Sequence, residues 1–173
     1  MLPTPENLPP TNFSTDMALP SGTSIIDLNF LGVRESVGLY LLEGNAELAL
    51  VDSGPSSCLP GLGNFLAARN LTLADISALL LTHIHFDHAG AAGTLVKENP
   101  DLRVYVHEIG AKHLKDPSRL LKSATRLYGD ALQQMFGEFL PVPEENIHAL
   151  AGGESIRAAG REIEVAYTPG HAS

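Results

Sequence analysis

Three histidines and one aspartate occupy six consecutive positions of the segment THIHFDHAG, residues 82–90. The whole chain has seven histidines, so this short segment is unusually dense in them. Neutral imidazole and carboxylate are good ligands for zinc and other borderline divalent metals, whereas such a group has no obvious use in a protein core. The segment therefore predicts a metal site.

The spacing within this segment indicates how its residues could share metal ions. His83 and His85 stand two apart, so in an extended segment leaving a strand they project to the same side and can bind one metal. Asp87 and His88 follow at once, and a turn there would bring them to a second metal beside the first. The small residues 89–92 then allow close backbone packing and the start of a helix.

The apolar pattern predicts the elements that position this segment. The run ISALLLT just before it is typical of a strand covered on both faces, so the histidines should lie at a strand end. A helix from about Ala89 to Glu98 should stop at Asn99-Pro100, and the alternating RVYVH predicts another strand. This strand–helix–strand order implies an α/β layer architecture.

Further elements are expected on the N-terminal side of this unit. The stretches TSIIDLNF, VGLYLLEG and ELALVDSG, separated by glycines and by Gly44-Asn45, predict a β-meander over residues 23–51. In SSCLPGLGNFLAARN, apolar residues at helical spacing predict a helix with Ser56 or Ser57 as N-cap and Asn70 as its end.

The C-terminal part should contain one long helix and one more strand. Apolar residues recur at three- and four-residue steps over residues 118–136, which predicts an amphipathic helix broken near Gly129. Its opposite side carries Arg119, Lys122 and Arg126. We interpret this basic stripe as a solvated face rather than a binding surface for an anionic substrate. The alternating EIEVAY predicts a strand that delivers His171, in TPGHAS, to a loop.

Composition and charge narrow the classes of protein. The 173 residues fit one domain, with 44% hydrophobic and 18% charged residues, as in ordinary globular chains. A net charge of −9 without any Lys/Arg cluster argues against nucleic acid as a partner. No signal-peptide pattern and no apolar run of about 18 residues occur, so we expect a cytoplasmic protein that does not bind membranes.

The chain should consist of a Pro-rich arm, residues 1–22, that is extended and loosely attached, followed by one domain over residues 23–173. The lone Cys58 cannot form an internal disulfide, and we interpret it as a buried or helix-start thiol rather than a nucleophile. The remaining histidines, His107, His113 and His148, lack neighbouring ligands and are interpreted as surface or satisfied residues.

Three motifs in order resemble those of the metallo-β-lactamase superfamily of hydrolases. THIHFDHAG matches its HxHxDH signature, LVDSG resembles its first motif and TPGHAS its third. The resemblance implies that His83, His85 and His171 bind one zinc ion, while Asp87 and His88 belong to a second. It also implies that Asp52, in LVDSG, lies near the metals and supports their ligands from behind.

By family mechanism, a zinc-activated hydroxide attacks an ester-like carbonyl, and the metals stabilise the resulting oxyanion. Metal coordination lowers the pKa of bound water to about 7, so no side-chain nucleophile is needed. The resemblance makes Asp52 and Asp87 the candidate catalytic carboxylates. It implies one or two zinc ions, with iron or manganese as alternatives, and a small ester, thioester or lactone as substrate. The motifs are specific for the superfamily and weak for the substrate.

The sequence departs from the family pattern in two places. Family members continue past the third motif with a half that supplies an aspartate bridging the metals and a further histidine, and that completes an αβ/βα sandwich. This chain ends at Ser173, so we expect an incomplete domain with an exposed sheet face and few ligands for the second metal. Glutathione thioesterases of the family usually have a histidine where this chain has Ile84.

Other functions remain open at this point. A single-iron dioxygenase of the same superfamily keeps the histidines, and metal analysis would separate it from a zinc hydrolase. A chain without catalytic competence could instead only bind metal or a partner subunit, and an oligomer is possible.

Overall fold

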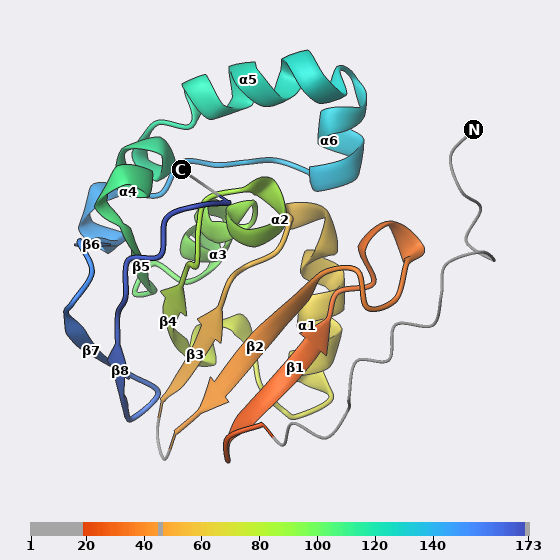
Figure 1. The fold of residues 1–173 in the computed structure, drawn as a ribbon. Coiled ribbons are helices and arrows are strands. Elements are labelled where there is room, and N and C mark those ends of the chain that lie inside the picture. The colour runs from red at the N-terminus through yellow and green to blue at the C-terminus, as the bar shows by residue number, and fades with distance from the viewer. Residues whose placement is uncertain (1–18, 45–46, 172–173) are drawn as a thin grey trace.

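The computed structural model describes residues 19–44 and 47–171, and a mixed six-stranded sheet forms its centre (Figure 1). The strands, in their order across the sheet, are β1 (Thr23–Asp27), β2 (Gly38–Glu43), β3 (Leu48–Val51), β4 (Ile76–Leu80), β5 (Arg103–His107) and β6 (Ile147–Leu150). The first three strands pair antiparallel, and β3 to β6 pair parallel. A separate antiparallel hairpin consists of β7 (Ser155–Ala158) and β8 (Arg161–Glu164).

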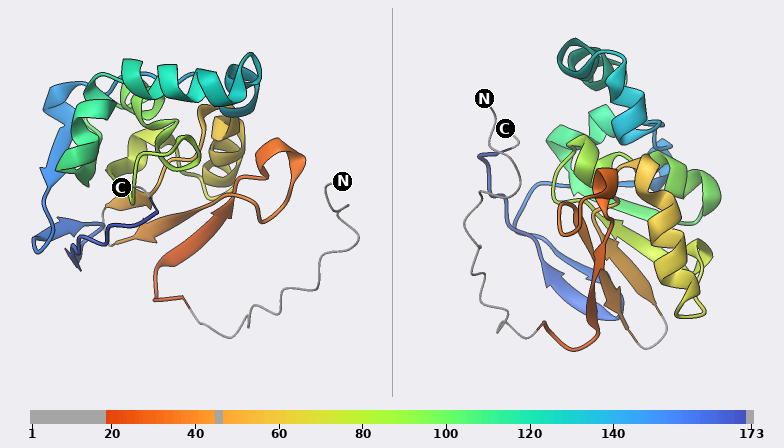
Figure 2. Two further views of the ribbon diagram at one scale, coloured as in Figure 1. Left: turned by 45° about the horizontal axis from the view of Figure 1, so that its top comes forward. Right: turned by 90° about the vertical axis from the view of Figure 1, so that its right-hand side faces the viewer.

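The helices lie on one face of the sheet and the hairpin β7–β8 lies on the other (Figure 2). The helices are α1 (Leu59–Ala67), α2 (Phe86–Ala89), α3 (Ala92–Glu98), α4 (Glu108–Lys115), α5 (Ser118–Tyr128) and α6 (Ala131–Phe136). Single 3-10 turns occur at Phe30–Gly32, Ser56–Cys58, Leu73–Asp75 and Glu144–Asn146. The expected α/β layer architecture is confirmed.

The alternation of side chains along the strands sets the two faces of the sheet. Leu39 and Leu41 of β2 are fully buried on the helix side, together with the alternate residues of the neighbouring strands. On the other side, a smaller cluster of alanines lies between β3, β4 and the hairpin. Beyond the hairpin this second face is open, with Ile25 54% and Tyr40 43% exposed, as the sequence predicted.

The predicted β-meander is confirmed, with β1 and β2 in register from Thr23 opposite Leu42 to Asp27 opposite Gly38. Its second predicted turn, Gly44-Asn45, extends outside the described residues, as do residues 1–18 of the N-terminal arm. The buried strand before the histidines is β4, and the break of the long helix near Gly129 is confirmed as the gap between α5 and α6.

The predicted N-cap of α1 is wrong. Cys58, not Ser56 or Ser57, occupies the N-cap position, and its side chain makes no capping hydrogen bond. The reason is tertiary: the Ser57 hydroxyl donates to the carbonyl of Met135, and the Ser56 hydroxyl donates to the carbonyls of Phe136, at the end of α6, and of Glu138, just after it. The two serine hydroxyls therefore connect the start of α1 to the C-terminal end of α6.

Three predicted boundaries also differ. The helix expected to end at Asn70 ends at Ala67. The helix expected from Ala89 begins at Ala92, because the motif itself forms the separate short helix α2. The last strand ends at Glu164, not at Tyr167, because its partner β7 is only four residues long. Among the described helices, none has the length and apolar character needed to cross a membrane.

Candidate metal centre

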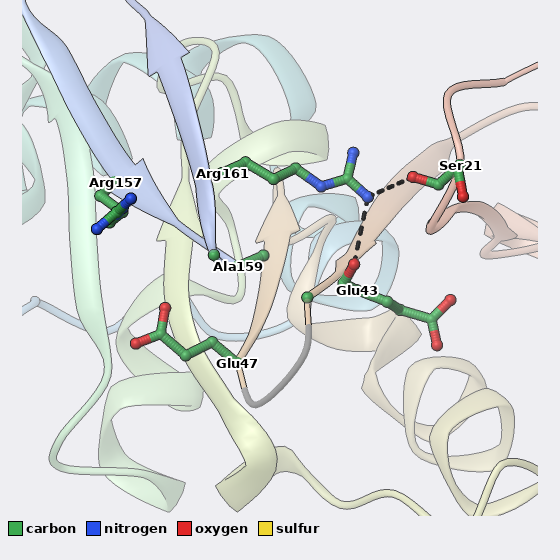
Figure 3. Close-up of a pocket in the computed structure, with 8 residues that line it drawn as sticks. Ser21, Glu43, Glu47, Arg157, Ala159 and Arg161 are labelled. Atoms are coloured by element: carbon green, nitrogen blue, oxygen red, sulfur yellow. Dashed lines mark hydrogen bonds between the residues drawn. The ribbon is translucent and has the colours of Figure 1, made fainter.

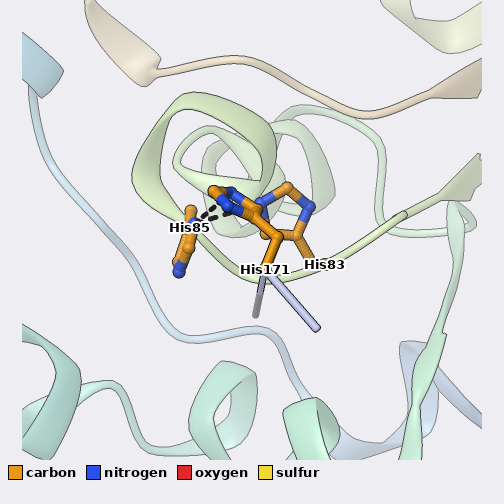
Figure 4. A group of neighbouring side chains, drawn as sticks. All are labelled: His83, His85 and His171. Atoms are coloured by element: carbon orange, nitrogen blue, oxygen red, sulfur yellow. Dashed lines mark hydrogen bonds between the residues drawn. The ribbon is translucent and has the colours of Figure 1, made fainter. Parts of the chain in front are cut away.

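Three imidazoles meet just beyond the carboxyl end of β4. His83 Nε2 lies 3.1 Å from His85 Nδ1, which in turn lies 3.2 Å from His171 Nε2 (Figure 4). All three nitrogens lie within 4.8 Å of one another. His83 and His85 lie on the extended segment between β4 and α2, as predicted, and His171 reaches them from the far end of the chain.

A buried carboxylate lies behind these imidazoles. Asp52 follows β3, is 6% exposed and has a φ of 64°, a left-handed conformation that Asp tolerates better than most residues. Its Oδ1 accepts the Thr82 backbone N–H at 2.8 Å, and both of its oxygens lie within 3.0 Å of the Thr82 hydroxyl. Its Oδ2 lies 2.8 Å from His88 Nδ1. Asp52 is therefore a tertiary link and not just a turn residue.

The hydroxyl of Thr82 extends this network to the histidine cluster. It lies 3.0 Å from His83 Nδ1, so the opposite ring nitrogen, Nε2, is the one that faces His85. A hydrogen bond at one ring nitrogen fixes the orientation of an imidazole and the nitrogen that is left for a metal. Thr82 was not predicted as a site residue, although it stands directly between the predicted strand and the first histidine of the motif.

Asp87 and His88 lie beside the cluster without joining its close group of nitrogens. His88 Nε2 is 3.4 Å from Asp87 Oδ2, and the His88 ring lies 3.9 Å from the His83 ring, centroid to centroid. Nδ1 of His88 is held by Asp52, so Nε2 points toward Asp87. Asp87 and His88 therefore lie next to the three-histidine group as a neighbouring carboxylate–imidazole pair.

The protonation of the cluster differs from residue to residue. Burial, and then the neighbouring His88 and His85, lower the pKa of His83 to about 4. Burial, followed by the nearby His171, also lowers the pKa of His85. The hydrogen bond to Asp52 raises the pKa of His88, against the opposing effect of its burial. His83 and His85 are therefore neutral at pH 7 and keep the lone pairs that a metal requires.

Small residues let the motif pack against the end of β3. A Cβ on Gly90 would lie 2.3 Å from the Phe86 carbonyl oxygen and 3.0 Å from Pro55 Cα. Ser53, which is 2% exposed, donates its backbone N–H to the His88 carbonyl at 2.7 Å. The predicted close packing after the motif is confirmed, and Ser53 is a second residue of this region that the sequence analysis missed.

The other histidines and the cysteine lie outside the cluster. His107 caps α4 and stacks on Tyr167, and His148 stacks on Tyr105. Cys58 is buried, and that burial raises the pKa of its thiol, which disfavours the nucleophilic thiolate.

An open hollow of about 520 Å³ lies at the opposite end of the sheet, where the hairpin meets β1 and β2 (Figure 3). Arg161 of the hairpin donates there to the carbonyls of Ser21 at 2.7 Å, Gly22 at 2.6 Å and Glu43 at 3.3 Å. This guanidinium joins β8 to the start of β1 and the end of β2. The hollow is lined by the residues that attach the hairpin to the sheet, and it lies far from the histidines.

Residues 35–173 match the family model described as the Metallo-beta-lactamase superfamily, and the chain belongs to this superfamily. The chain is 29% identical to the probable metallo-hydrolase MJ0888 of Methanocaldococcus jannaschii over 147 residues, which cover 85% of this chain and 63% of that protein. The chain is also 44% identical to the hydroxyacylglutathione hydrolase of Pseudoalteromonas translucida over 61 residues. These residues make up 35% of this chain and 21% of that protein.

A solved structure shows the same arrangement. The metallo-beta-lactamase family protein TTHA1429 from Thermus thermophilus superposes with a TM-score of 0.69 and 29% identity, over 90% of this chain and 54% of that one. The superfamily fold predicted from the motifs is therefore confirmed. The chain spans 63% of the metallo-hydrolase and 54% of the solved chain, less than two thirds of either.

Proposed function

We propose that this chain carries the metal centre of a hydrolase that acts on a small ester, thioester or lactone. The observation that supports this most is the meeting of three imidazole nitrogens within 4.8 Å, one of them from a residue 86 positions away from its neighbour. Local sequence cannot produce that meeting. The fold must bring the C-terminal loop to the end of β4.

The donor set fits zinc. In a tetrahedral site with bonds of about 2.0–2.1 Å, two ligand nitrogens lie about 3.3 Å apart. The observed separations of 3.1 and 3.2 Å, from His83 to His85 and from His85 to His171, are close to that value. Three protein ligands leave a fourth position for water or substrate, as in catalytic rather than structural zinc sites.

Asp87 and His88 would hold a second metal beside the first. Asp52 accepts from Nδ1 of His88 and so directs Nε2 of that ring toward the second position. Asp52 would thus act on the ligand, while Asp87 would be a ligand itself and the carboxylate nearest the reacting atoms. Among the described residues these two ligands are fewer than zinc usually takes, so in this chain the first position should bind more tightly than the second.

Metal ions in such a site polarise a carbonyl and make water a nucleophile near neutral pH. The residues of this chain orient the ligands: Thr82 fixes the His83 ring, and Asp52 fixes the His88 ring. No serine or cysteine nucleophile is required, in keeping with the buried Cys58.

The substrate class rests on the relatives. One similar protein is named a hydroxyacylglutathione hydrolase and another, from Emericella nidulans, a thioesterase. Both names denote cleavage of ester-like bonds. Ile84 in the middle of the motif weakens the case for a glutathione thioester in particular. The cytoplasmic location and the boundary at residue 22 stay predictions.

A direct experiment would load the purified chain with zinc, manganese or iron(II), and measure hydrolysis of a panel of thioesters, esters and lactones. We expect turnover with zinc that is abolished by chelation. Oxygen consumption with iron(II) and a persulfide, without hydrolysis in any metal form, would instead identify a dioxygenase of the same superfamily.

A further inference from the structure

Backbone hydrogen bonds tie the start of the segment that carries His171 to the turn before the hairpin. Val165 donates to the Glu154 carbonyl at 2.8 Å and accepts from the Gly153 N–H at 2.7 Å. Strand β8 has already ended at Glu164. From Val165 to His171 the chain crosses toward the end of β4 as an irregular segment, the dark blue trace that approaches α2 in Figure 1.

One aromatic contact holds the middle of this segment. The ring of Tyr167 stacks on the ring of His107, with centroids 4.4 Å apart and planes 18° apart. Tyr167 is 51% exposed, so general burial does not fix its position. The turn at Gly152 packs against the backbone of Tyr167. A Cβ on Gly152 would lie 2.7 Å from Tyr167 Cβ and 2.9 Å from the Tyr167 backbone nitrogen.

His107 is itself held firmly. It is the last residue of β5, and its Nδ1 accepts the Ile109 N–H at 3.3 Å as the N-cap of α4. Strand β5 pairs directly with β4, through Leu80 opposite Tyr105. The platform under Tyr167 therefore belongs to the same rigid sheet edge that presents His83 and His85.

We propose that His107 and Tyr167 are a positioning pair that sets the place of His171, and with it the affinity of the metal centre. The proposal rests on the proposed function, because it assumes that the three histidines bind a metal. The stack fixes Tyr167 relative to β5, four residues before the third ligand. A ligand held in place before binding loses less conformational entropy when the metal arrives, so the stack should raise affinity.

Four single substitutions separate this role from a merely structural one. Tyr167→Ala removes the stack, and Tyr167→Phe keeps it. His107→Asn keeps an acceptor for the Ile109 N–H and loses the ring, whereas His107→Phe keeps a ring and loses the acceptor. The stack and the helix cap are thus removed one at a time.

Two quantities should be measured for each variant: zinc affinity, by competition with a chromophoric chelator, and the melting temperature of the metal-free chain. We expect Tyr167→Ala and His107→Asn to weaken zinc binding by about 10-fold, the lower range for residues that orient ligands. Tyr167→Phe and His107→Phe should bind zinc with an affinity within about 3-fold of that of the original chain, a change smaller than the loss of a ligand-orienting residue causes. His107→Phe should nevertheless melt at a lower temperature, because its cap is lost.

The possible failures are distinguishable. If the original chain binds zinc through its histidines but all four variants bind it equally well, the positioning proposal is overturned and the proposed function stands. If affinity follows melting temperature across the four variants, or Tyr167→Phe is as weak as Tyr167→Ala, the stack has no positioning role. If the original chain binds no zinc, the proposed function itself fails.

Discussion

Oδ2 of Asp52 lies 2.8 Å from Nδ1 of His88, across a sequence distance of 36 residues. Asp52 directly follows β3 and His88 belongs to α2, so this contact joins the carboxyl end of one strand to the motif that follows its parallel neighbour. Because the carboxylate is buried and also accepts from Thr82, its position is well determined.

Replacing Asp52 with asparagine should remove the negative charge at this position and keep the backbone conformation. Asparagine tolerates the φ of 64° at this position, so Asp52→Asn should fold, whereas Asp52→Ala would add strain. We expect the pKa of His88 to fall, because the carboxylate that raises it is gone. Hydrolysis should fall about 10- to 100-fold while tightly bound metal is retained. NMR titration and kinetics would check the two effects, and an unchanged rate would leave Asp52 with a structural role alone.

The hydroxyl of Thr82 can be tested with a matched pair of variants. Thr82→Val removes the hydroxyl contacts to Asp52 and to His83 Nδ1 but leaves the backbone N–H bond to Asp52, and Thr82→Ser retains all of them. Loss of this hydrogen bonding should cost about 1 kcal/mol of the free energy of unfolding and should weaken metal binding. Chemical denaturation and metal competition would measure both. Equal metal affinity in the two variants would contradict a role in orienting His83.

The metal-free chain should show two histidines with opposite titration behaviour. Burial lowers the pKa of His83 from 6.5 to about 4, so between these values the unfolded chain binds a proton that the folded chain excludes. Its contribution to stability is therefore lost as the pH falls from 6.5 toward 4. His88 has a raised pKa, so its contribution is present below 6.5 and is lost as the pH rises through its folded value.

NMR of the imidazole Cε1–H resonances would follow both groups separately. Bound zinc should suppress the titration of both histidines over the pH range in which the metal stays bound. Titration of His83 near 6.5 in the metal-free chain would show that the ring is more hydrated than its burial in the structure implies.

Removing either of the first two histidines should remove most bound metal. His83→Ala and His85→Ala each delete one nitrogen of the proposed three, and plasma emission should show a large loss of metal for each. His113→Ala, on α4, is the matched control, because His113 lies outside the cluster. Full metal content in both cluster variants would mean that the ligands are elsewhere.

The sequence was most informative where the signal was local. The period-two spacing of His83 and His85 after a buried apolar run correctly placed both side chains together at a strand end. Parallel strands present their carboxyl ends at one edge, which is why Asp52 reached the same place. The link from this edge to His171 came from the resemblance of three ordered motifs, not from any local pattern.

The misassigned features depend on contacts distant in sequence. Ser56 and Ser57 look like N-caps, but carbonyls about 80 residues away take their hydroxyls. Thr82 was not singled out, because its partner Asp52 lies 30 residues earlier in the chain. The Tyr167–His107 stack was equally invisible, since the predicted strand through Tyr167 ends three residues before it.

The central claim is that His83, His85 and His171 bind one metal ion. X-ray absorption spectroscopy of the chain loaded with one equivalent of zinc tests it most directly, because it counts the ligands and identifies their type. The structure predicts three imidazole nitrogens at about 2.0–2.1 Å and a light fourth ligand. In the His171→Ala variant the imidazole count should fall to two. A sulfur ligand at about 2.3 Å, or an imidazole count unaffected by His171→Ala, would contradict the account.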